Sequence, residues 1–348
     1  MREHVPTPPG NTAISVMDKI TEAASLVPAP RFEPPDPESI LHWAGLYYRV
    51  HVAGSPAKTE QAKKKDLSRF LSFYMEELGH HRVDSWTPAV TKHFQRGLAA
   101  AVSPVTKQPY KATTVNRVMA TVRHFGAWLH KQRPLLAGSP LAGVKDIAID
   151  APDWNGLTNR QIMRLKSACE QRLNFCKRGD QNPLLERAVF LVLLNTGLRE
   201  SELVSLHAWQ YHHRGFHDVA RKGSRISKKV PVPVEAKEAL DAYLATRKQP
   251  IEKEAPLFAS RYGSRLAAQD VARICERLCR QACAHLDEKE SFRLTPHMLR
   301  HTFLKRVADK HGVHVAQQMS GNVSIQEIFR YTKPSQDEVD ETAEGVFG

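Results

Sequence analysis

Apolar residues recur at intervals of three or four over most of this chain, which is the spacing of one buried face of an α-helix. In the stretch KATTVNRVMATVRHFGAWLHKQ, for example, Val115, Val118 and Val122 share a face with Phe125. One stretch differs, because HDVARKGSRISKKVPVPV alternates and holds Gly223 amid basic residues, which is typical of a β-hairpin. The pattern predicts a mainly α fold in two domains, with a small antiparallel β-sheet in the second.

The first helical region predicts an all-α domain at residues 36–145. Four amphipathic segments follow one another there, and the second has Thr59 as its expected N-cap and Gly79 at its end. The region closes at PLLAGSPLAGV, a turn-rich linker. Clustered prolines before it, in PTPPG and VPAPRFEPPDP, predict a disordered arm at residues 1–35, with room for a short helix at 13–26.

The full chain has 348 residues, a length that suits two domains. Its remaining part predicts a second domain at residues 150–340 and a short tail at 341–348. A capped segment, LTNRQIMRLKSACEQRL, and an apolar segment that breaks at NTG come before the hairpin. Helices are expected after it at residues 234–247, 268–285, 296–311 and 313–319. Near the end, Val339, Ala343 and Val346 form a small apolar stripe, with a frayed tail as the alternative.

The charge of the chain indicates a kind of partner. Its formal net charge is +13 and its pI is about 9.6. This excess favours a polyanion such as nucleic acid, although a merely soluble basic protein is the alternative. No run of about 18 apolar residues occurs and the start of the chain lacks a secretory signal, so we expect a cytoplasmic protein with no membrane partner.

The five cysteines do not predict a metal site. Cys275, Cys279 and Cys283 repeat every four residues along one helical stripe, apart from Cys169 and Cys176. Zinc sites usually use pairs of cysteines with two residues between them, or loops that mix cysteine and histidine. We therefore expect small buried thiols in a reducing compartment.

Two arginines and a histidine point to phosphate chemistry. NTGLRESEL places Arg199 after a glycine turn at the start of a helix, with Glu202 on the next turn, and TPHMLRHTF places His297 and Arg300 on one helical face. Guanidinium groups are permanently charged, bidentate donors, and imidazole donates or accepts a proton. Together they suit the charge that develops on a phosphodiester under attack. Each residue alone is also typical of an ordinary surface or structural role.

A lysine and a tyrosine complete this chemistry. Lys222 precedes Gly223 at the tip of the expected hairpin, and Tyr331 stands in IFRYTKP near the end of the chain. A tyrosine can attack phosphorus, but its ordinary pKa of about 10 requires a nearby base and positive charge. A lysine can protonate the leaving 5′ oxygen, a role for which Lys228 and Lys229 compete with Lys222. No metal ion is needed, since the guanidinium groups supply the positive charge that stabilises the attacked phosphate.

The order of these motifs resembles the tyrosine recombinases, the family of phage integrases and chromosome-dimer resolvases. The resemblance rests on TGLRESEL, a basic hairpin with a KG turn, HMLRHTF, and a tyrosine nine residues after a polar position. It covers residues 37 to about 340. It implies a helical core-binding domain followed by a catalytic domain, an enzyme without a cofactor, and double-stranded DNA as substrate.

The resemblance also implies a role for each matching residue. Arg199 and Arg300 would clamp the scissile phosphate, and Glu202 would orient Arg199 or a neighbour. His297 would act as general acid or base and as a phosphate ligand. Tyr331 would be the nucleophile that forms a 3′-phosphotyrosine link.

Two positions leave alternatives open. Lys222 would protonate the leaving 5′ oxygen, but the hairpin is about one residue longer than the family's common form, which keeps its later lysines as candidates. Asn322 stands where the family usually has His or Trp; it can donate a hydrogen bond but cannot shuttle a proton. A slower enzyme, an unaffected one or a decayed site would each be consistent with it. His301 is expected to pack, and Tyr110 and Tyr262 are set aside as nucleophiles because neither follows a His-x-x-Arg helix.

Basic residues on the polar faces of the first domain are candidates for contacts with DNA phosphates, with a solvated face as the alternative. They are Lys63, Lys64, Lys65, Lys111, Arg117 and Arg123. Arg330, beside the expected nucleophile, is a further candidate.

The function expected is site-specific recombination that integrates, excises or resolves DNA of a mobile element or replicon. Two protomers would bind one core site with inverted arms, and four would synapse two sites. A type IB topoisomerase-like enzyme and a DNA-binding regulator with the same fold are the alternatives. The sequence leaves open the DNA site, and whether a second recombinase or an accessory DNA-bending factor takes part.

Overall fold

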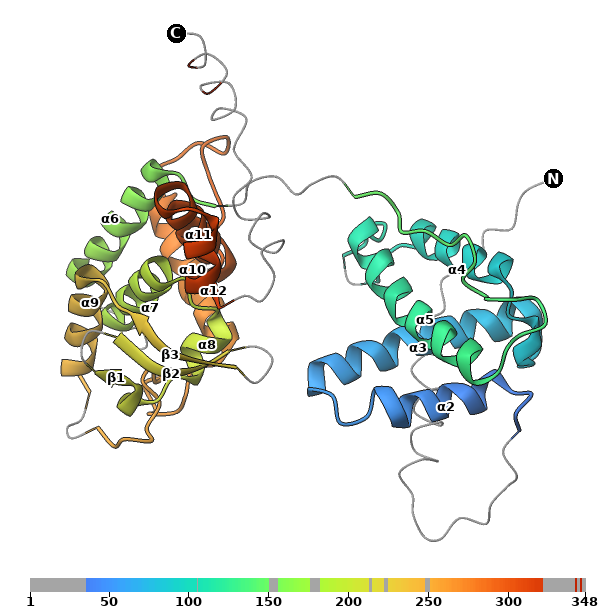
Figure 1. The fold of residues 1–348 in the computed structure, drawn as a ribbon. Helices are drawn as coiled ribbons and strands as arrows, with labels where there is room; N and C mark the ends of the chain where they lie inside the picture. Colours follow the sequence, from blue (N-terminus) through green and yellow to red (C-terminus); the bar gives the residue numbers. More distant parts are fainter. Residues whose placement is uncertain are drawn as a thin grey trace. The chain divides into compact units, whose positions relative to one another are not determined.

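The structure, a computed structural model, describes residues 36–104, 106–149, 156–175, 182–212, 215–221, 225–247 and 251–321, together with residues 342 and 345. The chain divides into two compact units, residues 1–150 and 151–348 (Figure 1). The predicted arm at residues 1–35, with its short helix, and the apolar stripe of Val339, Ala343 and Val346 lie outside the described residues.

The first unit contains four α-helices in its described part, and a short 3-10 helix connects the second to the third. They are α2 (Ile40–His51), α3 (Ala57–Leu78), η1 (Val83–Ser85), α4 (Pro88–Ala100) and α5 (Ala112–Gln132). The prediction that Thr59 caps α3 is wrong, because the helix already begins at Ala57 after Pro56, whose carbonyl accepts from the Thr59 amide at 2.7 Å. It ends at Gly79 in the left-handed conformation, as predicted.

Trp86 is the largest fully buried side chain of the first unit. Its indole Nε1 donates to Thr91 Oγ1 at 2.8 Å, and that hydroxyl donates to the Pro140 carbonyl at 2.7 Å. The ring also lies against Gly126 of α5. Trp86 thereby joins α4, α5 and the segment after α5 in one core.

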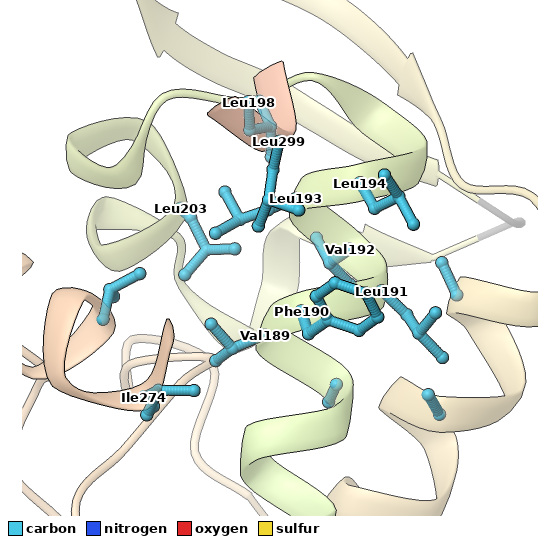
Figure 2. Packing of buried hydrophobic residues seen from close by; sticks show 14 of the residues in the cluster. Val189, Phe190, Leu191, Val192, Leu193, Leu194, Leu198, Leu203, Ile274 and Leu299 are labelled. Atoms are coloured by element: carbon cyan, nitrogen blue, oxygen red, sulfur yellow. The ribbon is translucent and has the colours of Figure 1, made fainter. Parts of the chain in front are cut away.

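The second unit is built around α7 (Pro183–Thr196). Seven consecutive residues of this helix, 188–194, are buried, so apolar side chains point outward in every direction, as Figure 2 shows for Val189 to Leu194. The other helices are α6 (Asn159–Phe175), α8 (Glu200–Ser205), α9 (Val234–Ala245), α10 (Ala268–Ala282), α11 (Pro296–His311) and α12 (Val313–Ser320). Four of them, α6, α9, α10 and α11, pack against α7. These helices follow the predicted ranges to within three residues at each end.

A buried carboxylate ties three of these helices together. Glu186, at the start of α7, is 1% exposed. It accepts from Arg172 Nε of α6 at 2.6 Å and from Arg277 Nε of α10 at 2.8 Å.

The sheet of the second unit has three antiparallel strands in the order β1-β2-β3. They are β1 (Tyr211–His212), β2 (Gly215–Arg221) and β3 (Arg225–Pro231), with a short 3-10 helix, η2 (Ala208–Gln210), before them. Arg221 pairs with Arg225, so residues 222–224 join the two long strands. The predicted mainly α fold with a small antiparallel sheet is confirmed. The helices that the structure describes are all too short or too polar to cross a lipid bilayer.

Candidate active site

Arg199 is positioned by a tight turn between two helices. α7 ends at Gly197, whose φ of 62° is left-handed, and Arg199 is the extended N-cap of α8. Glu202, three residues on and 4% exposed, accepts from the Arg199 amide at 2.9 Å with Oε2 and from Arg199 Nη1 at 2.8 Å with Oε1. One carboxylate therefore fixes both the backbone and the guanidinium of Arg199.

Arg300 reaches the same turn from α11. Thr295 caps that helix by accepting from the Met298 amide, as the TPHMLRHTF motif predicts. The Arg300 side chain is buried; Nη1 donates to the Gly197 carbonyl at 2.6 Å and Nη2 to the Ser320 carbonyl at 3.0 Å. It thus links the turn after α7 with the end of α12.

His297 lies with both arginines, one helical turn before Arg300. Burial lowers its pKa below the ordinary 6.5, and the positive charges of Arg300 and Arg199 lower it further. The His301 ring packs edge-on against it, with centroids 4.4 Å apart. Burial, then His297 and Arg300, lower the pKa of His301 to about 4. Both imidazoles are consequently neutral near pH 7.

A third guanidinium, which our reasoning from sequence missed, adjoins this group. Arg221 ends β2, its side chain is 3% exposed, and Nη1 donates to Glu202 Oε2 at 2.5 Å. Arg221 stands in a run of basic residues, so its charge alone does not distinguish it from its neighbours. Strand alternation was the available signal, since a residue two positions after the inward-facing Val219 points to the same face.

The structure therefore brings Arg199, Glu202, His297 and Arg300 together. Lys222, Asn322, Arg330 and Tyr331 lie outside the described residues.

Both lysines that rival Lys222 lie on β3: Lys228 is 88% exposed and pairs with Asp218 at 3.2 Å, and Lys229 is also exposed. Tyr262 is 79% exposed beside the turn glycine Gly263, and the Tyr110 hydroxyl accepts from Arg69.

The candidate DNA contacts of the first unit lie on two packed helices. Lys63, Lys64 and Lys65 belong to α3, Lys111 precedes α5, and Arg117 and Arg123 belong to α5. Arg117 makes a bidentate pair with the fully buried Asp66, at 2.6 and 2.9 Å. Arg123 pairs with Asp146 at 2.5 Å. Both arginines therefore have structural partners as well.

The arrangement suits the binding of a phosphodiester without a metal ion. Two fixed guanidinium groups offer charge and donors, and a neutral imidazole can accept a proton. Within the described ranges, no three His, Cys, Asp or Glu side chains gather as a metal site would need. Cys169, Cys275 and Cys279 are buried, and burial raises the pKa of each thiol to about 12.

Comparisons with known proteins bear on the family and the fold of the chain. A model of the phage integrase family matches residues 156–338. The chain is 27% identical to tyrosine recombinase XerC of Thermodesulfovibrio yellowstonii over 287 residues, which cover 80% of this chain and 86% of that protein. A lambda integrase dimer bound to a COC′ core site has the same fold, with a TM-score of 0.60 and 16% identity over 85% of this chain and 95% of the other. XerH recombinase bound to a palindromic difH substrate, in a post-cleavage complex, also has this fold. Its TM-score is 0.63 and its sequence identity is 14%, over 97% of this chain and 96% of the other.

Proposed function

The chain belongs to the phage integrase family and is a tyrosine-type site-specific DNA recombinase, and on that premise we propose that it cuts and rejoins DNA through a 3′-phosphotyrosine link at Tyr331. The observation that carries the proposal is the convergence of Arg199, His297 and Arg300, whose charges act on one another. Such a group would bind the scissile phosphate and favour the crowded, more highly charged transition state.

In the proposed cleavage step, one bond to phosphorus forms as another breaks. The phenol oxygen of Tyr331 attacks the phosphorus, its proton passes to His297, and the bond to the 5′ oxygen breaks. Lys222 protonates that oxygen as it leaves. The 5′ hydroxyl of a partner strand then attacks the phosphotyrosine in the reverse sense. The covalent link keeps the energy of the phosphodiester, so no ATP is consumed.

Asn322 would take the place of a proton-carrying or packing residue next to this phosphate. An amide can donate a hydrogen bond to a non-bridging oxygen, but it adds neither charge nor a titrating group. The two arginines and His297 would then supply all the charge and proton transfer on that side.

The proposed partner is double-stranded DNA with two inverted arms, bound by two protomers and synapsed by four. The lambda integrase relative is a dimer on a core site, and the XerH substrate is palindromic. Basic residues of α3 and α5 would hold the backbone of each arm without reading its sequence. The task would be integration, excision or resolution of the DNA of a mobile element or replicon.

A covalent adduct tests the proposal. The protein and its Tyr331→Phe variant are incubated with nicked duplexes drawn from the DNA that flanks the gene, and denaturing gels detect protein joined to DNA. We expect an adduct that the Phe variant lacks, and that Tyr262→Phe, a control at another tyrosine, retains. An adduct that survives Tyr331→Phe, or tight binding with no adduct, would contradict the proposal. Strand exchange between two sites distinguishes a recombinase from a topoisomerase.

A further inference from the structure

Arg221 is the most deeply buried guanidinium beside Glu202. Its side chain is 3% exposed, against 26% for Arg199 on the other side of the same carboxylate. Arg199 keeps part of its side chain exposed, whereas protein atoms cover Arg221. A buried charge is stable only when it is paired and hydrogen-bonded, and Arg221 meets this condition at Glu202 Oε2 and at Ser227 Oγ, 2.9 Å from its Nε.

Glu202 connects the two arginines. Its Oε2 accepts from Arg221 Nη1 and from the Arg199 amide, and its Oε1 accepts from Arg199 Nη1. Because Ser227 of β3 holds Arg221 across the hairpin, the carboxylate is anchored by the sheet as well as by its own helix. The orientation of the exposed guanidinium then depends on that of the buried one.

The same guanidinium lies against the end of α12. A Cβ placed on Gly321 would come within 3.1 Å of Arg221 Nε, so no side chain fits there without a shift. The preceding residue, Ser320, is held through its carbonyl by Arg300. Arg221 therefore touches β3, α8 and the end of α12, three segments that adjoin proposed catalytic residues in the sequence: Lys222, Arg199 and Asn322.

We propose that Arg221 is a positioning residue of the cleavage step, acting on the scissile phosphate through Glu202 and Arg199 without contact with DNA. The inference rests on the proposed function, and it goes beyond it because Arg221 is not among the residues that bind or transfer a group. A misplacement of about 1 Å in a catalytic group can cost roughly 10²-fold in rate. Removal of Arg221 is expected to act at this scale.

A double-mutant cycle on single-turnover adduct formation tests the route of action. Arg221→Met is expected to slow the reaction by about 10²-fold, while Arg199→Ala and the double variant should be equally slow. Arg221→Lys should recover part of the rate, since lysine keeps the charge but not the second directed donor. A wild-type rate in Arg221→Met, or losses that multiply in the double variant, would overturn the proposal.

Two controls separate positioning from folding. Arg172→Met removes a guanidinium from another buried carboxylate, Glu186, and should lower stability without changing the adduct rate. If Arg221→Met does not fold, the cycle is run with Arg221→Lys, which is expected to show a smaller loss that again disappears in the Arg199→Ala background.

A second measurement does not depend on cleavage. In full-length protein with labelled histidines, the NMR titration of His297, assigned with His297→Gln, reports how close Arg199 is held. Arg221→Met should raise the pKa of His297, because Arg199 is released and Glu202 is less neutralised, whereas Arg172→Met should not. An unchanged pKa of His297 in Arg221→Met would refute the inference, whether or not the wild-type protein forms an adduct. Absence of an adduct in the wild-type protein would count only against the proposed function.

Discussion

Gly197 serves the site in three ways at the scale of one residue. Its left-handed φ of 62° ends α7 and turns the chain toward Arg199, and its carbonyl accepts from Arg300. A Cβ there would lie 2.3 Å from the Phe303 ring, so the residue also lets α11 approach.

Gly197→Ala should therefore destabilise the second unit strongly. We expect a loss of about 3 kcal/mol, from a left-handed backbone that costs roughly 1–2 kcal/mol and from overpacking that costs roughly 1–3 kcal/mol. The measurement is urea unfolding. Gly263→Ala is the matched control, since its φ is 80° but nothing lies within 4 Å of the added Cβ. Equal losses in the two variants would show that the contact with Phe303 does not matter.

The partly buried His301 gives stability a pH dependence. Its pKa is about 4 in the folded protein and about 6.5 in an unfolded chain, so between these values the unfolded state binds the extra proton. The free energy of unfolding should be fully present above about pH 6.5, fall as the pH drops toward 4, and level off below. Unfolding titrations across this range should show a smaller fall in His301→Gln. His297 contributes in the same direction, so a residual slope is expected, and an unchanged slope would contradict the assignment.

At the scale of elements, capping and spacing determine most helix boundaries. Thr87, Asn182 and Thr295 each accept from the amide three residues on, and each is followed by proline. These signals are local, which is why the range of α11 could be predicted closely. Thr59 is also of a residue type that favours an N-cap, but no proline follows it, and the helix already begins after Pro56.

The contact between α5 and Trp86 can be tested with a pair of glycines. Gly126→Ala should improve helix propensity by about 0.8–1.0 kcal/mol, yet its Cβ would lie 2.9 Å from the buried indole. Because overpacking costs roughly 1–3 kcal/mol, we expect a net loss of stability. Gly97→Ala on α4 meets nothing within 4 Å and should be stabilising. Chemical unfolding of both variants measures the change in the free energy of unfolding. A stabilising Gly126→Ala would mean that the Trp86 ring can shift to accommodate the added Cβ at little cost.

At the scale of the whole molecule, the net charge of +13 predicts that DNA binding weakens steeply with salt. Each phosphate contact contributes about 0.9 to the slope of log affinity against log salt. Lys63→Gln with Lys65→Gln should reduce that slope by up to about 2. Lys131→Gln, at the far end of α5, is the control and should leave it unchanged. Binding isotherms at several salt concentrations measure the slopes; an unchanged slope in the double variant would remove α3 from the interface.

Arg117 shows why these candidates differ although all are basic. Its guanidinium neutralises Asp66, a buried carboxylate on another helix, so its removal would destabilise the first unit as well as weaken any DNA contact. Any loss of DNA affinity in an Arg117 variant should therefore be interpreted together with the measured free energy of unfolding of that variant.

The sequence alone determined the helix pattern, the hairpin, and the local motifs around Arg199 and around His297 and Arg300, because each depends on spacings of a few positions along the chain. Only the tertiary structure decided which charges are buried and shared. Arg221 meets Glu202 across 19 positions and Arg117 meets Asp66 across 51. The physical reason is that burial of a charged group is a property of packing between distant segments, and a local pattern records the charge but not what surrounds it.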